Sequence, residues 1–135
     1  MLDGHWGLVM HKSKLAGFII DCQTDDLEEA THFWAEALGM PERELPASEA
    51  ALYKGLTDVH HGLSIEVQIV KHPSRVHLDI ETDDIPAEVS RLEKLGAKQI
   101  QAVHAWVVME APTGQRFCVV RADSKSFAEQ ATAWP

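Results

Sequence analysis

The residues of this chain with the clearest chemical potential lie in residues 75–81, where polar and apolar types alternate strictly. His77 and Asp79 fall on one face of this predicted strand, because side chains two positions apart point the same way, and Arg75 and Glu81 follow the same alternation. A histidine oriented by a carboxylate can act as a general acid or base near neutral pH. His77 equally suits a polar pocket in which it only forms hydrogen bonds, and both interpretations stay open.

A second alternating segment, residues 63–69, places Glu66 and Gln68 on one face. Glu66 is the second candidate catalytic residue, since its carboxylate could orient His77 or contact a ligand. Gln68 is a candidate pocket residue. Two predicted strands thus each have a polar face. These faces could line a cleft, or they could simply be exposed to solvent.

Trp106 and Cys118 complete the set of candidate pocket residues. Residues 105–110 form a predicted strand in which Trp106 shares one face with Glu110 at the end of the strand. The Trp106 ring could therefore line a ligand pocket or fill the core. Cys118 lies between two apolar residues of another predicted strand. That setting is typical of inert packing, although a nearby histidine would lower the thiol's pKa and make it a nucleophile.

The elements that must position these side chains occur twice. Residues 24–39 and residues 82–96 both begin with Thr-Asp-Asp and end with Leu-Gly, and a strand-like run precedes each. Aspartate before a helical pattern predicts an N-cap, and glycine after it predicts a left-handed stop. The repeated unit is therefore a strand, a capped helix and further strands.

We expect each copy to have the order β-α-β-β-β. The predicted modules are residues 14–70 and 75–122, with a leader at 1–13 and a tail at 123–135. The helical stripes and the apolar face of residues 75–81 supply the expected core, which comprises Phe33, Trp34, Val76, Leu78, Ile80, Ile85, Val89, Leu92 and Leu95.

Composition limits the class of protein. A chain of 135 residues with 45% hydrophobic residues suits one domain, and its formal charge of -9 disfavours binding to nucleic acid. The sequence has no apolar run of about 20 residues, which predicts no membrane span. Its two cysteines lie in strand-like runs, so no disulfide framework is predicted and a cytoplasmic location is expected.

Several segments of the sequence resemble glyoxalase-like domains of the vicinal oxygen chelate superfamily, which is also called the glyoxalase, bleomycin resistance and dioxygenase superfamily. The resemblance rests on residues 20–27, 33–39, 75–84, 95–97 and 111–120. It implies an α+β fold of two tandem β-α-β-β-β modules whose mixed sheets curve around a cleft. Members of this superfamily include glyoxalases, ring-cleaving dioxygenases, epimerases, thiol transferases and drug-sequestering proteins, so the fold does not name a reaction.

The resemblance also bears on metal binding, because metal-using members place a His or Gln on the first strand and a Glu on the last strand of each module. His77 falls on one such position, but residues 17–20 of module one hold no ligand and Cys118 stands where a Glu would be. We therefore expect no metal cofactor, and the usual forms of glyoxalase I and extradiol dioxygenase are disfavoured. If a metal were bound, His77, Glu66 and Cys118 would be its ligands and zinc would suit them.

The sequence predicts a glyoxalase-like protein that acts on or binds a small organic molecule in the cleft between the modules. A lyase or another small-molecule enzyme is one outcome, and a non-catalytic binding protein of the bleomycin-resistance type is the alternative. We expect a homodimer, because a duplicated sheet edge invites symmetric pairing.

Overall fold

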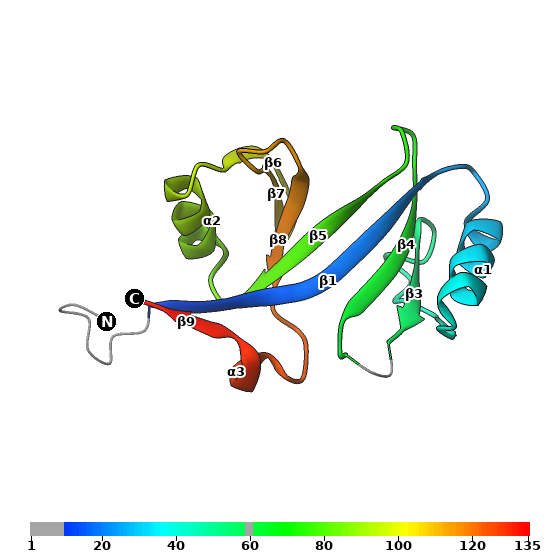
Figure 1. Ribbon diagram of the computed structural model, residues 1–135, viewed down its shortest axis with the longest axis horizontal. Helices are drawn as coiled ribbons and strands as arrows, with labels where there is room; N and C mark the ends of the chain where they lie inside the picture. The colour runs from blue at the N-terminus through cyan, green and yellow to red at the C-terminus, as the bar shows by residue number, and fades with distance from the viewer. Residues whose placement is uncertain (1–9, 59–60) are drawn as a thin grey trace. The chain divides into compact units, whose positions relative to one another are not determined.

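The computed structural model of the protein describes residues 10–58 and 61–135 (Figure 1). Most of the predicted leader therefore lies outside the described residues. The chain divides into two compact units: Gly17–His77, here called the α1 unit, and the remaining described residues, here called the α2 unit. Strands β1 and β5 each run through the boundary. The elements in chain order are β1 (His11–Gln23), α1 (Leu27–Leu38), β2 (Glu42–Arg43), β3 (Tyr53–Thr57), β4 (Ser64–Val70), β5 (Arg75–Thr82), α2 (Ile85–Lys94), β6 (Lys98–Val103), β7 (Trp106–Glu110), β8 (Arg116–Arg121), α3 (Phe127–Gln130) and β9 (Thr132–Trp134).

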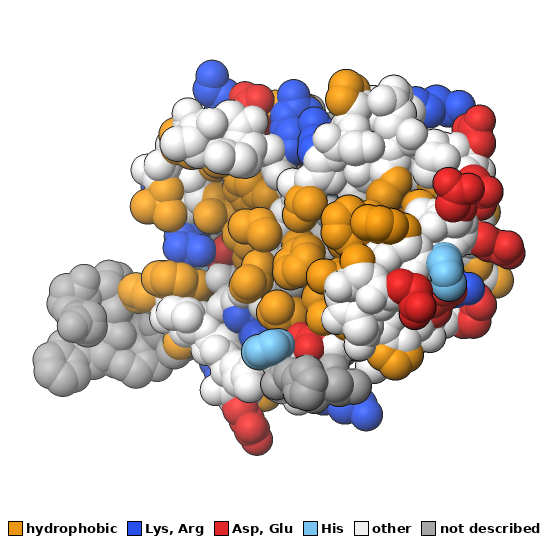
Figure 2. Space-filling view, turned by 45° about the vertical axis from the view of Figure 1, so that its right-hand side comes forward, with side chains coloured by type: hydrophobic (Ala, Val, Ile, Leu, Met, Phe, Trp, Pro, Cys, Tyr) orange, Lys and Arg blue, Asp and Glu red, His pale blue; other side chains and the backbone are white. Residues whose placement is uncertain are grey.

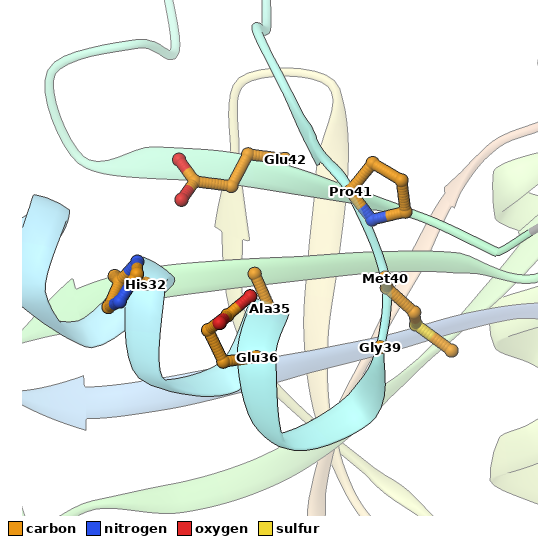
Figure 3. Close-up of a pocket in the computed structure, with 7 residues that line it drawn as sticks. All are labelled: His32, Ala35, Glu36, Gly39, Met40, Pro41 and Glu42. Atoms are coloured by element: carbon orange, nitrogen blue, oxygen red, sulfur yellow. The ribbon is translucent and has the colours of Figure 1, made fainter.

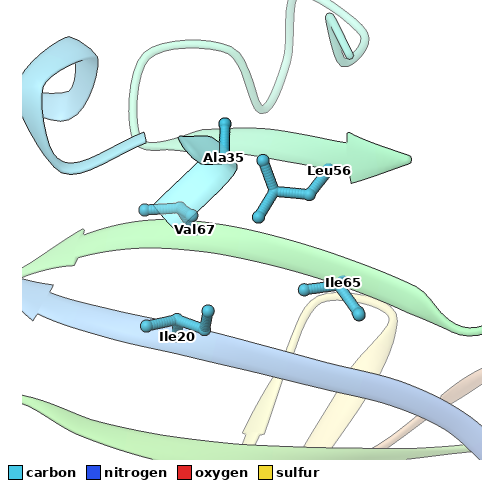
Figure 4. Close-up of a cluster of buried hydrophobic side chains, with 5 residues drawn as sticks. All are labelled: Ile20, Ala35, Leu56, Ile65 and Val67. Atoms are coloured by element: carbon cyan, nitrogen blue, oxygen red, sulfur yellow. The ribbon is translucent and has the colours of Figure 1, made fainter. Parts of the chain in front are cut away.

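The α1 unit contains a mixed sheet in the order β2-β3-β4-β1, in which β1 and β4 are parallel and the other neighbours are antiparallel. Helix α1 packs on one face of this sheet. The side chains between them form a buried apolar cluster of Ile20, Ala35, Leu56, Ile65 and Val67 (Figure 4). The opposite face, here called the helix-free face, carries the residues of alternate parity on β1, β3 and β4.

Helix α1 begins and ends as its sequence predicts. The Asp26 carboxylate accepts a hydrogen bond from the backbone N–H of Glu29, and Gly39 adopts a left-handed conformation with φ of 68°. Because a residue with a Cβ is strained in that conformation, glycine stops the helix there and turns the chain toward β2. The cap and the stop fix which face of α1 meets the sheet.

The α2 unit repeats the pattern with strands in the order β5-β8-β7-β6, where β5 and β8 are parallel. Asp84 caps helix α2 by accepting from the N–H of Ala87, and Pro86 lies in its first turn. The buried cluster beneath α2 contains Val89, Leu92, Ala97, Met109 and Val119. The predicted α+β fold with two β-α-β-β-β modules is thus confirmed.

Four predicted core residues are exposed. Phe33 is 59% exposed because it follows the outer surface of α1, while its neighbour Trp34 contacts the buried cluster. Leu95 lies beyond the last turn of α2 and is 66% exposed. On β5, Ile80 contacts the cluster under α2, whereas Val76 and Leu78 precede the covered part of the strand and are exposed.

The C-terminal segment extends the sheet of the α2 unit. Its strand β9 pairs antiparallel with residues 11–13 of β1, and the indole N–H of Trp134 donates to the hydroxyl of Ser13 over 2.9 Å. The apolar run of residues 15–22 by itself predicts a strand of that length, but β1 begins earlier, at His11. The difference arises because β9 supplies a pairing partner that the local pattern does not reveal.

A fully buried carboxylate on α2 joins three elements of this unit. Glu88 lies 2.7 Å from the imidazole of His11 on β1 and accepts two hydrogen bonds from Arg91, whose guanidinium lies 3.8 Å from the centre of the Trp134 ring. Burial raises the pKa of the Glu88 carboxyl, but the contacts with Arg91, His11 and Ser13 outweigh burial and hold the pKa below its ordinary value.

Replacing Glu88 tests how much this network stabilises the fold. We expect Glu88→Gln to lower the free energy of unfolding by about 3 kcal/mol or more, because Arg91 and His11 would lose a buried charged partner. Glu93→Gln changes an exposed residue of the same helix and should stay within about 0.5 kcal/mol of the parent. Urea denaturation of the three proteins measures the difference.

The same substitution predicts a change in acid sensitivity. The folded pKa of Glu88 lies below its ordinary value of 4.5, so its stabilising contribution is present above that pH and is lost as the pH falls through the folded pKa. The parent protein should therefore lose stability on acidification below about pH 4.5, and Glu88→Gln should lose less over the same range. Equal slopes of unfolding free energy against pH would contradict this account.

Candidate functional site

The strand register collects polar side chains on the helix-free face of the α1 unit. Glu66 on β4 is the register partner of Ile19 on β1, and Gln68 on the same strand is the partner of Asp21. Tyr53 on β3 pairs with Gln68 from the other side. Glu66 and Gln68 therefore share the face that the sequence assigns to them, and they are half-buried there.

A short hydrogen bond on this unit joins Asp21 to His77. The Nδ1 atom of His77 lies 2.8 Å from Oδ2 of Asp21. Asp21 is only 2% exposed, and the His77 side chain is 14% exposed. A carboxylate only accepts hydrogen bonds, so this geometry favours the tautomer in which Nδ1 carries a proton and donates it to Asp21. When the ring is neutral, the basic nitrogen of that tautomer is Nε2.

Sequence reasoning missed Asp21 as a partner of His77 and named Asp79, Glu81 or Glu66 for that role. The signal for Asp21 is its place within the apolar run of residues 15–22, since an acid in a buried strand requires a polar partner. Its second oxygen, Oδ1, is also buried and has no hydrogen-bond partner within the described part of the chain. Arg75 is more remote, because its Nε lies 3.7 Å from Oδ2 and its side chain is about half exposed.

Asp79, Cys118 and Trp106 belong to the α2 unit. Asp79 on β5 is the register partner of Cys118 on β8, which in turn pairs with Val108 on β7. Trp106 precedes Val108 by two residues, so it lies on the same face of the sheet as Cys118 and Asp79. All three are half-buried, and the Trp106 ring lies 6.3 Å from that of His104.

Both cysteines are free thiols. Cys22 faces α1 and contacts the buried cluster there, and burial raises the pKa of its thiol. The thiol is therefore poorly ionised at neutral pH, which is the state of an inert packing residue. The place of Cys22 in a strand-like run of the sequence agrees with this environment.

Glu81 does not share the role predicted for its face of β5. It is 1% exposed, and one oxygen accepts hydrogen bonds from the backbone N–H groups of Asp123 and Ser124 while the other accepts from Lys14. Burial raises the pKa of the Glu81 carboxyl, but the hydrogen bonds from Ser124, Lys14 and Asp123 outweigh burial and lower the pKa. Glu81 thus anchors the C-terminal segment.

The donor residues do not fit the four-ligand metal site of metal-using superfamily members. In the α1 unit, the residue beside Glu66 in the β1–β4 register is Ile19, which offers no ligand atom. In the α2 unit, Asp79 and Cys118 are register partners and offer one oxygen and one soft thiol, which suit zinc better than a hard cation that needs several oxygens. The predicted alternative set divides between the units, with His77 and Glu66 in one and Cys118 in the other, so it stays a prediction.

A surface cavity of about 370 Å³ lies elsewhere on the α1 unit. It is lined by His32, Ala35, Glu36, Gly39, Met40, Pro41 and Glu42 (Figure 3). None of the sequence-predicted site residues lines this cavity. Figure 2 shows acidic side chains gathered over the surface where α1 lies, so this side of the unit repels anions.

No helix within residues 10–58 and 61–135 combines the length and apolar character that crossing a membrane requires. This finding agrees with the absence of a long apolar run in the sequence.

The chain was also compared with known proteins. A family model described as a glyoxalase-like domain matches residues 17–120. Similar solved structures include the hypothetical protein BH1468 from Bacillus halodurans C-125, at 14% identity and a TM-score of 0.60 over 84% of this chain and 96% of that one. Methylmalonyl-CoA epimerase from Mycobacterium tuberculosis matches at 17% identity and a TM-score of 0.60 over 95% of this chain and 97% of that one. These identities show similarity of fold alone, and a search of curated proteins finds no match.

A double-mutant cycle measures whether Asp21 and His77 interact as the geometry indicates. We expect Asp21→Asn and His77→Gln to show a coupling energy of about 1–3 kcal/mol in unfolding free energy, because the bond is short and its acceptor is buried. The matched control is the double-mutant cycle of Asp21→Asn with Arg75→Gln. It should couple by less than about 0.5 kcal/mol, since Arg75 is exposed and more distant. Equal coupling in the two cycles would show that the Asp21–His77 bond has no special weight.

Proposed function

This chain belongs to the glyoxalase-like domain family of the vicinal oxygen chelate superfamily, and on that premise we propose that it is a small-molecule enzyme working by acid–base chemistry at His77. The observation that supports this proposal is the 2.8 Å hydrogen bond between Nδ1 of His77 and the buried Asp21 carboxylate. The bond holds the ring in one tautomer and one orientation, which are the two properties a general base needs before a substrate arrives.

The proposed chemistry is transfer of a proton to and from a carbon next to a carbonyl group. Nε2 of His77 takes the proton from that carbon, and the electron pair of the broken C–H bond moves toward the carbonyl oxygen. The Asp21 carboxylate stabilises the imidazolium that forms, because the opposite charges are 2.8 Å apart and shielded from water. The imidazolium then returns the proton to either face of the carbon or to a leaving group.

This proposal covers isomerases, epimerases and lyases, which share the proton-abstraction step. One structural neighbour is named methylmalonyl-CoA epimerase, and that name makes inversion at a carbon the first reaction to test. Cys118 has no part in the proposed step, and no metal is required for it. The proposal is of a metal-free enzyme acting on a small organic molecule.

Hydrogen exchange at carbon tests the proposed function. The protein is incubated in D2O with methylmalonyl-CoA and a panel of small 2-oxo acids and thioesters, and deuterium uptake is followed by NMR. We expect His77→Gln to slow exchange by about 10²-fold or more, and Asp21→Asn to slow it as well, because the base would be lost or misoriented. Cys118→Ala, and the parent protein in the presence of EDTA, should retain the parent rate.

Two outcomes would contradict the proposal. Loss of exchange in EDTA, with recovery on addition of a divalent metal, would make the protein a metalloenzyme. Binding of a compound that both the parent and His77→Gln retain, with no exchange in either, would make it a binding protein of the sequestering type.

A further inference from the structure

We infer that the ligand of the proposed site is a small organic acid and that Arg43 binds its carboxylate. This inference rests on the proposed function, which puts the reacting atoms at His77, and it adds the class of substrate. Arg43 lies on β2, a short strand at the edge of the sheet.

Arg43 lies on the same face of the sheet as Glu66 and Gln68. It is the register partner of Gly55 on β3, and Gly55 is in turn the partner of Glu66 on β4. Register partners in a sheet point to the same side, so the three residues form a row across the helix-free face. Among the side chains of this row, Arg43 carries the positive charge.

The absence of a side chain at Gly55 fixes where the guanidinium lies. A Cβ built on Gly55 would come within 2.8 Å of both Cζ and Nη2 of Arg43. The guanidinium therefore lies over Gly55, in the space that the Cβ of another residue would fill. This position places the planar donor group over the helix-free face, where it can meet a ligand.

The two glutamates that flank Arg43 in the sequence do not neutralise its charge. Glu42 and Glu44 both contact Lys54, at 3.8 and 2.6 Å, and Lys54 alternates with Gly55, so it points to the α1 side of β3. The Arg43 side chain has no hydrogen bond or ion pair with any residue that the structure describes. Since the chain carries a formal charge of -9, an anionic ligand needs such a local cation to bind.

The positions of Arg43 and His77 limit the size of the acid. From Gly55, beneath the guanidinium, to Asp21 the path crosses two strand spacings and moves two residues along β1, which together amount to roughly 12 Å between Cα positions. Between them lies Gln68, whose half-buried side chain offers a polar group, while Ile19 is buried. The geometry therefore suits an extended acid whose reacting carbon lies several bonds from the carboxylate that Arg43 holds.

The experiment uses hexanoate, hexanamide and hexyl phosphate as probes, with binding followed at the Nε–H signal of Arg43 by NMR. We expect hexanoate to bind about ten-fold or more tightly than hexanamide, because a fork of charge-assisted hydrogen bonds requires an anion. Arg43→Gln should remove this preference. Gly55→Ala should also remove it although Arg43 is still present, because the added Cβ displaces the guanidinium. Arg121→Gln, an exposed change on β8, is the charge-matched control and should keep the preference.

Each outcome decides the inference. Equal binding of hexanoate and hexanamide, no hexanoate-dependent shift at Arg43 at the highest soluble concentration, or tighter binding of hexyl phosphate would overturn it. Thermal unfolding of both α1-unit variants checks that they remain folded. If His77-dependent deuterium exchange occurs in uncharged compounds and survives Arg43→Gln, the acid–base function stands and the carboxylate inference fails. If hexanoate binds at Arg43 but no compound shows His77-dependent exchange, the proposed function fails instead.

Discussion

The hydrogen bond between Asp21 and His77 is the interaction on which the functional account depends. A carboxylate that is 2% exposed is costly to bury, and a partner with a proton to donate is the way a protein offsets that cost. His77 supplies the proton from Nδ1. The hydrogen bond orients both side chains. With its proton held on Nδ1, the neutral ring has Nε2 as its basic nitrogen.

Buried carboxylates recur in this chain, and their partners separate structural roles from chemical ones. Glu88 is held by Arg91 and His11, and Glu81 by Lys14 and two backbone N–H groups, so the donors in each case satisfy a charge that joins elements of the α2 unit. These donors lower the pKa of both acids. Asp21 differs, because its partner is a histidine, which can also exchange a proton with a ligand.

The fold explains why one sheet face of the α1 unit is available for this chemistry. Helix α1 covers the opposite face, and its capping by Asp26 and termination at Gly39 determine where that coverage ends. On β4, the alternation of residues then directs Ile65 and Val67 to the helix, and Glu66 and Gln68 to the helix-free face. The short strand β2 adds Arg43 to that face only because Gly55 leaves room for its guanidinium.

Sequence reasoning predicts most of the elements, because capping residues, glycine stops and alternation are local signals. Helices α1 and α2 and the face shared by Glu66 and Gln68 follow from such signals. The pairing of His77 with Asp21 does not, since it depends on which strands become neighbours. The pairing of β9 with β1 was not predictable for the same reason. For Phe33, periodicity places an apolar residue on the helix but does not show how wide a face of the helix is buried.

The position of the proton on the His77 ring shows whether Asp21 prepares this residue as a base. Long-range ¹H–¹⁵N NMR of the parent protein at neutral pH distinguishes the two neutral tautomers by the shifts of the ring nitrogens. We expect the tautomer with its proton on Nδ1, bonded to Asp21, and an unprotonated Nε2. A ring that carries its proton on Nε2, or an even mixture of both tautomers, would show that Asp21 does not prepare His77 in this way.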